Sequence, residues 1–448
     1  MGFLRQSTAL AFWVLALLAV GGCDREPADD RPEGVLLKIS CGSVGLEFTI
    51  CNEGAQRWAR ATDNRVEVVS TPNSTTARLA LYQQLLGAGA DDIDVLQVDV
   101  IWPGILAPHL LDLGPAAAGA EEAHFKAIIE NNTVGGRLVA MPWYTDAGVL
   151  YYRKDLLERY NEDVPATWAE LTETAARIQA AERSAGNDRM WGFVWQGRAY
   201  EGLTCNALEW VASFGGGTLV DADGRVTIDN PRAAAALELA ASWVGTISPP
   251  GVLNYAEEEA RGVFQSGNAV FMRNWPYAWT LAQSKESPIR DRVGVTTLPA
   301  GPGGKTAATL GGWQLAVSKY SRHPELASRL VRFLTSPEEQ ERRAIAGAYN
   351  PTIAALYNRP AVLAANPFFD RLYETFTHAV PRPSRLAGPR YNELSSEFWS
   401  SVSSVLAGQQ TAPEALGQLA PRMERLLQAA RDEAGPTRDS APEPPAGT

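Results

Sequence analysis

The sequence has little of the chemistry that metal and nucleic-acid sites need. Its 448 residues include 4 Cys and 4 His, and no CxxC pair or metal-ligand spacing of Cys and His occurs among them. Positive charge is also scarce, since 40 Lys and Arg stand against 51 Asp and Glu for a net charge of -11. That balance has the wrong sign for neutralising phosphates. We therefore expect no metal, no cofactor and no nucleic-acid partner.

The motifs of common enzyme classes are missing as well. No G-x-S-x-G, H-E-x-x-H or G-x-G-x-x-G pattern is present. The sequence Gly304-Lys305-Thr306 imitates the end of a phosphate-binding loop, but Pro299 stands where that loop requires glycine. Any chain this rich in acids contains pairs of carboxylates that could serve glycoside hydrolysis. Their presence therefore does not discriminate a glycosidase from other proteins. The sequence predicts a protein that is not an enzyme.

The first residues are arranged like an export signal. Arg5 precedes an apolar run over 9–20, and a pair of glycines then precedes Cys23. This ending resembles the lipobox of bacterial lipoproteins, and a plain secretory cleavage site is the alternative. We expect a signal peptide over 1–22 and a lipidated Cys23 that opens a flexible tether over 23–34. The protein would then be exported and anchored to the cell membrane, facing the periplasm or the extracellular side.

After residue 34, no apolar run approaches the roughly 18 residues of a membrane-spanning helix. In an oxidising compartment Cys41 and Cys51 could close a small loop, and whether they do is left open. Cys205 stands in an aromatic and aliphatic stretch typical of a buried free thiol. The histidines are isolated from one another and are expected at surface or cap positions: His109, His124, His323 and His378.

Strand and helix signals alternate along the chain. Thr167 opens a capping box, and Asn230 and Ser336 each precede a proline at the first position of a helix. The region after Pro324 is almost wholly helical in pattern. The alternation predicts an α/β protein with largely parallel sheets. Short β-branched or aromatic runs predict its strands at 35–40, 66–70, 93–100, 138–144, 148–152, 191–195, 268–273, 293–298 and 313–318.

Aromatic residues interleaved with single polar groups form four segments, at 141–146, 191–197, 274–279 and 311–314. Such clusters suit a sugar, because the C–H faces of a pyranose stack on rings while its hydroxyls need charge-assisted hydrogen bonds. Core packing is the alternative for each segment. Their number and the neighbouring Gly, Pro and Asp favour a sugar site.

Longer strings make a family resemblance specific. They are YTDAGVLYYRKD (144–155), WGFVWQGRAYEG (191–202), RNWPYAW (273–279), AATLGGW (307–313) and AVPRP (379–383). They resemble the extracellular solute-binding proteins of carbohydrate ABC transporters, which are maltose-binding-protein-like, and within that family the trehalose/maltose-binding group. The likeness runs from about residue 35 to 430 in the right order.

The resemblance implies a two-lobed periplasmic-binding-protein fold of the class II type. Each lobe would be a mainly parallel sheet flanked by helices, with the ligand cleft between the lobes. The N-terminal lobe would comprise 35–148 and 299–350, and the C-terminal lobe 149–298 and 351–431. Residues 432–448, rich in Pro, Ala, Gly and charge, would be a disordered tail.

Carried over by motif position, the resemblance also implies the sugar-binding residues. Carboxylates and arginines would hold the hydroxyls, and aromatic rings would stack on the sugar. The residues are Asp99, Asp146, Glu201 and Glu47 as acids, Arg382 and Arg78 as arginines, Trp275 and Tyr277 as the stacking platform, Gly312 and Trp313 as the Gly-Trp pair at the cleft, and Tyr144.

The function implied is that of a substrate-binding lipoprotein of a sugar ABC importer. It would capture a disaccharide, trehalose or else maltose, by lobe closure, and deliver it as a monomer to membrane permease subunits served by a separate ATPase subunit. Two alternatives remain: a receptor for maltodextrins or another glucoside, and a secreted glycosidase.

Overall fold

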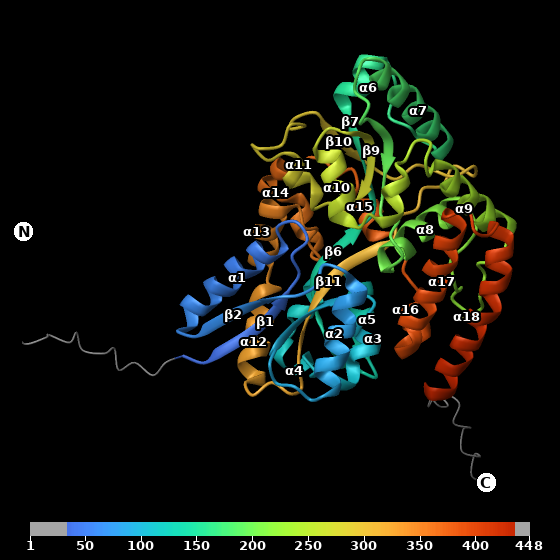
Figure 1. Ribbon diagram of the computed structural model, residues 1–448. Helices are drawn as coiled ribbons and strands as arrows, with labels where there is room; N and C mark the ends of the chain where they lie inside the picture. Colours follow the sequence, from blue (N-terminus) through green and yellow to red (C-terminus); the bar gives the residue numbers. More distant parts are fainter. Residues whose placement is uncertain (1–33, 435–448) are drawn as a thin grey trace, which may run out of the picture. The chain divides into compact units, whose positions relative to one another are not determined.

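The computed structural model describes residues 34–434. The predicted signal peptide, Cys23 and nearly all of the tether lie outside the described residues, as does 435–448. Among the helices of the described part, none is long and apolar enough to cross a membrane. Figure 1 shows two groups of strands, each accompanied by helices.

The first sheet is built from segments far apart in the chain. Its strand order is β2-β1-β3-β11-β6, in which β1 is parallel to β2 and β3 while β11 is antiparallel to β3 and β6. Every residue of β3 and β6 is buried, as expected for strands covered on both faces. The strands are β1 (Leu36–Cys41), β2 (Arg65–Ser70), β3 (Val95–Asp99), β6 (Met141–Ala147) and β11 (Leu310–Val317).

The second sheet has the order β10-β7-β9-β8. Here β8 is parallel to β9, whereas β7 is antiparallel to both β9 and β10. Its strands are β7 (Val149–Arg153), β8 (Trp191–Val194), β9 (Ala269–Asn274) and β10 (Val293–Thr296), and a separate hairpin pairs β4 (Thr133–Val134) with β5 (Arg137–Leu138).

Helices cover both sheets (Figure 1): α1 packs on β2 and α12 on β11, whereas α10 packs on β9 and α7 on β8. The long helices α17 and α18 pack on α9, and α17 also packs on α8. The helices are α1 (Glu47–Thr62), α2 (Thr75–Gly87), α3 (Pro103–Leu106), α4 (Gly114–Ala117), α5 (Lys126–Asn132), α6 (Lys154–Tyr160), α7 (Trp168–Ser184), α8 (Glu201–Ser213), α9 (Pro231–Trp243), α10 (Glu257–Gln265), α11 (Ala278–Ala282), α12 (Pro324–Leu334), α13 (Pro337–Gly347), α14 (Pro360–Ala365), α15 (Tyr373–Thr377), α16 (Ser384–Ala387), α17 (Tyr391–Leu406) and α18 (Ala412–Ala434).

Three segments of the chain run between the part that holds the first sheet and the part that holds the second. The first is Gly148, which alone separates β6 from β7, and the second is the return from β10 to β11. The third segment contains Val380 and lies beside the second. The amide of Leu310 donates to the carbonyl of Val380 at 2.9 Å, and the amide of Val380 donates to the carbonyl of Ala308 at 2.7 Å. Arg382 lies two residues after Val380.

Several sequence predictions are confirmed in detail. Thr167 closes the predicted capping box with Glu170, and the side chains of Asn230 and Ser336 cap α9 and α13. Cys41 and Cys51 form a disulfide that joins the end of β1 to α1, which answers a question that the sequence left open. Cys205 is a buried free thiol.

Other predictions are wrong. The sheets are mixed, not largely parallel. In the first sheet the chain leaves along β6 and returns along β11, so these two neighbours are antiparallel, and in the second sheet it enters along β7 and leaves along β10, which are antiparallel for the same reason. Residues 432–434 continue α18 and are not part of a disordered tail. His124 is buried, with its Nδ1 at 2.7 Å from the hydroxyl of Thr352. Burial lowers the pKa of His124 to about 4.

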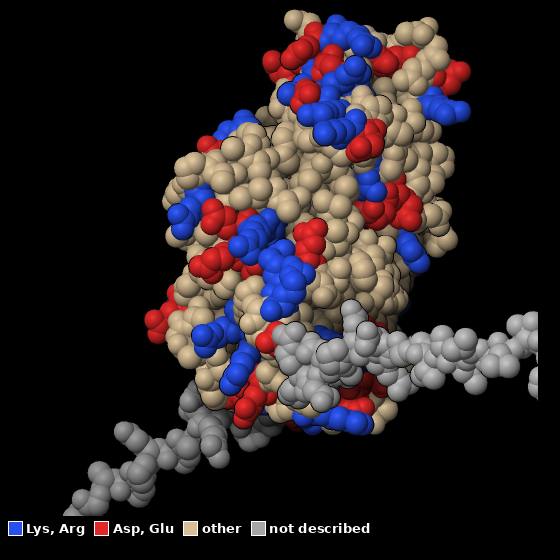
Figure 2. Space-filling view, turned by 90° about the vertical axis from the view of Figure 1, so that its left-hand side faces the viewer, with Lys and Arg blue, Asp and Glu red and all other residues tan. Residues whose placement is uncertain are grey.

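The acidic net charge does not form a continuous field on the face shown in Figure 2. Acidic and basic side chains alternate over it. A mixed surface of this kind gives no directional attraction for a charged partner on that face.

Candidate functional site

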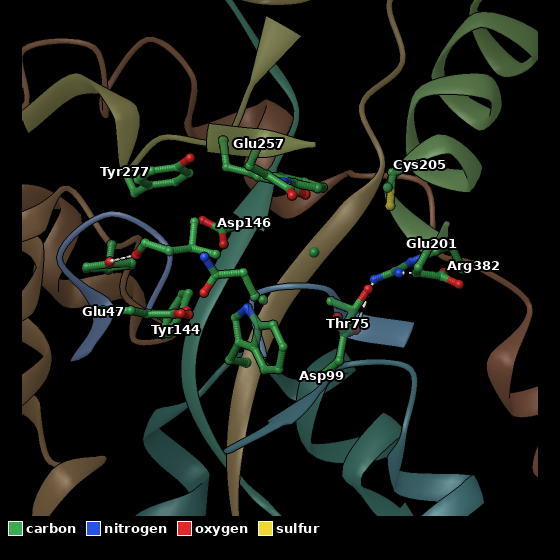
Figure 3. Close-up of a pocket in the computed structure, with 18 residues that line it drawn as sticks. Glu47, Thr75, Asp99, Tyr144, Asp146, Glu201, Cys205, Glu257, Tyr277 and Arg382 are labelled. Carbon is green, nitrogen blue, oxygen red and sulfur yellow. Dashed lines mark hydrogen bonds and ion pairs between the residues drawn. The ribbon is translucent and has the colours of Figure 1, made fainter. Parts of the chain in front are cut away.

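A cavity is lined by residues from both sheets and their connections (Figure 3). All predicted site residues line it except Arg78. Asp99, Tyr144, Asp146, Gly312 and Trp313 come from the first sheet. Trp275 follows the last strand residue of β9, and Glu201 begins α8. The residues predicted from separate motifs are therefore brought to one place.

Strand register explains how the first sheet assembles its share. Trp313 of β11 pairs with Asp99 of β3 on one side and with Tyr144 of β6 on the other. Gly311 pairs with Asp146, and Tyr144 and Asp146 are two residues apart on one strand, so their side chains share a face. A register shift after Trp313 marks an irregularity at this point. Bulges are frequent beside functional sites because they redirect side chains.

Gly312 is required by the backbone at this irregularity. Its φ is +118°, outside the range that residues with a side chain favour. A Cβ there would lie 2.6 Å from the carbonyl oxygen of Tyr144 and 2.7 Å from the Cα of Thr145. The absence of a side chain at this position allows β6 and β11 to approach closely beneath the cavity.

Glu47 forms one end of the cavity. It is the first residue of α1 and is 2 % exposed. Its Oε1 accepts hydrogen bonds from Tyr144 and, at 2.8 Å, from the side-chain amide of Gln97. Its Oε2 has no hydrogen-bond partner in the part of the chain that the structure describes. Glu47 thus offers a fixed acceptor beside the cavity.

Asp146 is the central carboxylate in Figure 3. It is 8 % exposed and lines the cavity, and within residues 34–434 no hydrogen bond to its side chain occurs. Burial, with a further contribution from the charge of Glu47, raises the pKa of Asp146 well above its usual range. A buried carboxyl group without partners is costly to ionise, and a ligand that donates hydrogen bonds would relieve that cost.

Arg382 joins the other two acids. Its Nη1 donates to Glu201 at 2.8 Å and its Nη2 donates to Asp99 at 3.2 Å. Glu201 also accepts from the hydroxyls of Tyr391 and Ser395, each at 2.6 Å. Because Asp99 ends β3 and Glu201 begins α8, this guanidinium bridges elements associated with different sheets.

Aromatic rings line the cavity between these charges. The guanidinium of Arg273 lies 4.0 Å from the ring centre of Trp275, and Arg273 is in turn held by a buried ion pair with Glu209. The hydroxyl of Tyr277 donates to Glu258 at 2.7 Å. Such fixed rings provide flat apolar surface next to hydrogen-bonding groups.

Arg78 does not line the cavity. It is fully buried behind the cavity wall, with its guanidinium 4.3 Å from the ring centre of Trp313 and its Nε donating to the carbonyl of Pro72 at 3.0 Å. Its two Nη atoms have no hydrogen-bond partner among residues 34–434. The structure therefore places Arg78 as a support for Trp313.

The segment over 191–197 is not part of the cavity. Phe193 and Trp195 are fully buried, and they pack with Trp168, Trp210 and Trp243 in the core of the second sheet's helices. Here the core alternative was correct. The alternation of aromatic and other residues along β8 is equally typical of a strand covered by helices. The pattern alone therefore could not discriminate a core strand from a sugar site.

Several lining residues were missed by the sequence analysis. The signals that could have found some of them are modest: Gly202 and Gly311 adjoin predicted residues, and Thr75 lies near Arg78. Glu257 and Tyr349 belong to no recognised motif. The missed residues are Val44, Asn73, Thr75, Gly202, Cys205, Glu257, Gly311 and Tyr349.

Within residues 34–434, no group of three or more His, Cys, Asp or Glu side chains is arranged to hold a metal ion. The cavity instead offers carboxylates, one paired arginine and aromatic rings, contributed by both sheets. Two α/β units with a shared polar and aromatic cavity form the architecture of a binding protein that encloses a small polar solute.

Comparison with known proteins agrees with this class. The family model described as "Bacterial extracellular solute-binding protein" matches residues 48–341. A "Probable ABC transporter-binding protein" of Deinococcus radiodurans is 52% identical over 401 residues, which cover 89% of this chain and 95% of that protein. The chain belongs to the bacterial extracellular solute-binding proteins.

Relatives with stated ligands are also similar. The solved structure "Maltose bound T. maritima MalE3" has a TM-score of 0.84 and 43% identity, covering 88% of this chain and all of that one. The "Maltodextrin-binding protein MdxE" of Bacillus subtilis is 28% identical over 318 residues, covering 66% of this chain and 67% of that protein. The family resemblance and the two-lobed fold predicted from the motifs are confirmed.

Proposed function

We propose that this protein is the sugar-binding component of an ABC importer and that it captures a neutral α-linked disaccharide in the cavity between its two sheets. Trehalose and maltose are the two candidates. The captured sugar is passed to membrane permease subunits that work with a separate ATPase subunit, and the binding protein acts as a monomer without a cofactor.

The observation that carries the proposal is the composition of the cavity wall. Glu47 offers a buried Oε2 that has no partner among the described residues, Asp146 offers a second carboxylate in the cavity wall, and Trp275 offers a ring face nearby. A disaccharide has hydroxyls that can donate to these carboxylates and C–H faces that can stack on the ring of Trp275. A neutral ligand also avoids adding charge to a cavity that already holds several carboxylates.

The comparisons support this choice of ligand class. The similar T. maritima structure holds maltose, and the B. subtilis relative is named for maltodextrin. The choice of trehalose as a candidate ligand rests on the motif resemblance alone. A receptor for maltodextrins or another glucoside remains the alternative within the class, and a secreted glycosidase the alternative outside it.

Thermal unfolding with a panel of sugars tests the proposal. A ligand that binds only the folded protein at 100 times its Kd stabilises it by about 2.7 kcal/mol. We expect trehalose or maltose to raise the melting temperature more than sucrose or maltotriose does. A rise with maltotriose alone would favour the maltodextrin receptor, and release of free glucose from either disaccharide would favour the glycosidase.

We also propose the division into lobes given above, with the N-terminal lobe over 35–148 and 299–350. The strands support it, because the first sheet uses only segments from this part and the second sheet only segments from 149–298. A sugar that contacts both lobes favours their closed arrangement by its differential affinity. Saturating disaccharide should then reduce the radius of gyration in solution scattering.

Lipid anchoring through Cys23 is a separate part of the proposal. It rests on the apolar run and the glycine pair that precede this cysteine. The full-length protein should partition with membranes, and a Cys23→Ala variant should not. Equal partitioning of both would reject the anchor and leave the sugar site unaffected.

A further inference from the structure

Glu257 places an additional carboxylate in the cavity wall. It is the first residue of α10, and in Figure 3 it lies above Asp146. Asp146 belongs to the first sheet, whereas Glu257 belongs to a helix that packs on β9 of the second sheet. The two acids therefore face the cavity from different sheets.

One oxygen of Glu257 is held in place by a buried phenol. The hydroxyl of Tyr200 donates to Oε2 of Glu257 at 2.6 Å, and Tyr200 is 4 % exposed. Burial and the charge of Glu257 raise the pKa of Tyr200 well above its usual range, so the phenol remains a donor. This hydrogen bond orients the carboxylate.

The other oxygen retains acceptor capacity. Its one hydrogen bond is a long one of 3.4 Å, from Nε1 of the Trp275 indole. A carboxylate oxygen can accept two hydrogen bonds. Because Trp275 is backed by Arg273 on one face, a ligand can stack only on the other face. An oxygen that can accept one more hydrogen bond thus stands at the edge of the ring that we propose as the stacking surface.

We propose that Glu257 is a further sugar-binding residue, whose Oε1 accepts a hydroxyl hydrogen bond from the pyranose stacked on Trp275. Tyr200 is its positioning residue. This inference rests on the proposed function and extends it: the sugar must present a free hydroxyl at the edge of that stacked ring.

The test is calorimetric titration of wild-type protein, Glu257→Gln and the control Glu259→Gln with trehalose and maltose. Glu259 also lies in the first turn of α10 but is exposed and caps the amide of Ala256, so both variants remove one charge from the same helix end. We expect Glu257→Gln to weaken binding about tenfold or more, as loss of a charge-assisted hydrogen bond implies. Glu259→Gln should bind like wild type.

A double-mutant cycle separates positioning from general damage. Tyr200→Phe should weaken binding in the wild-type background and have little further effect in Glu257→Gln. Additive losses would overturn the positioning role of Tyr200. If wild-type protein binds neither sugar, the proposed function and this inference both fail. If wild type binds and Glu257→Gln binds equally well, only the inference fails.

Discussion

Asp146→Asn should improve stability and impair binding at the same time. Asp146 is buried and has no hydrogen-bond partner in the described part of the chain, and the charge of Glu47 adds to the cost of ionising it. Because the folded-state pKa of Asp146 is raised, its ionised form costs stability at neutral pH, and that cost is relieved as the pH falls through the raised pKa. The amide keeps the shape of the side chain and removes the charge.

The two effects have different sizes. Without sugar, removing a buried unpaired charge should raise the free energy of unfolding by about 1 kcal/mol. For a lobe of this size that corresponds to about 2–4 °C in melting temperature. With sugar, losing hydrogen bonds to a charged group should cost about 1.5–3 kcal/mol of binding free energy, which is a loss of about ten- to over a hundredfold in affinity.

Thermal unfolding without sugar and calorimetry with maltose and trehalose measure the two effects on one preparation. Asp223→Asn is the matched control, because Asp223 is exposed in a surface turn beside Arg225. It should change neither quantity appreciably. An Asp146→Asn variant that melts lower than wild type and binds sugar with unchanged affinity would refute the reasoning and make Asp146 a structural residue.

Three further perturbations have defined outcomes. Arg382→Met should weaken sugar binding and also lower the free energy of unfolding by about 3 kcal/mol, because it leaves the buried carboxylates of Asp99 and Glu201 without their ion-pair partner; unchanged stability in denaturant unfolding would contradict this. Gly312→Ala should cost about 1–3 kcal/mol of stability, since its φ of +118° disfavours a side chain, and a melting temperature equal to wild type would be the opposing result. His124 has a pKa near 4 in the folded protein, so its stabilising effect is present above its ordinary value of about 6.5 and is lost as the pH falls toward 4. Between pH 7 and pH 4.5 wild type should lose about 2 kcal/mol more than His124→Asn in urea unfolding, and parallel losses would show that His124 does not titrate as described.

Local sequence signals predicted where helices begin, but they did not predict the directions in which neighbouring strands run. Thr167 and Asn230 determine helix starts through hydrogen bonds with residues close by in sequence, so reading the chain sufficed. The direction of β11 depends on where the chain returns from the other sheet, which no local pattern contains. The burial of His124 likewise depends on Thr352, which is distant in sequence.

Some residues of the site could likewise be predicted from the sequence, whereas others required the structure. Asp146 and Trp275 stand in long motifs and were found through the resemblance. Glu257 lines the cavity because α10, which it begins, packs on β9, whereas Arg78 packs against the ring of Trp313 and does not line the cavity. Position in a motif therefore predicted which segments meet, whereas the orientation of individual side chains required the packed structure.

Sugar capture in this cavity is the central claim, and calorimetric titration of wild type and Trp275→Ala with trehalose, maltose, sucrose and maltotriose tests it most directly. The account predicts that wild type binds trehalose or maltose with one site per chain, and that Trp275→Ala binds it at least about tenfold more weakly because the stacking surface is lost. Absence of binding by wild type to every sugar, or equal affinity in Trp275→Ala, would contradict it.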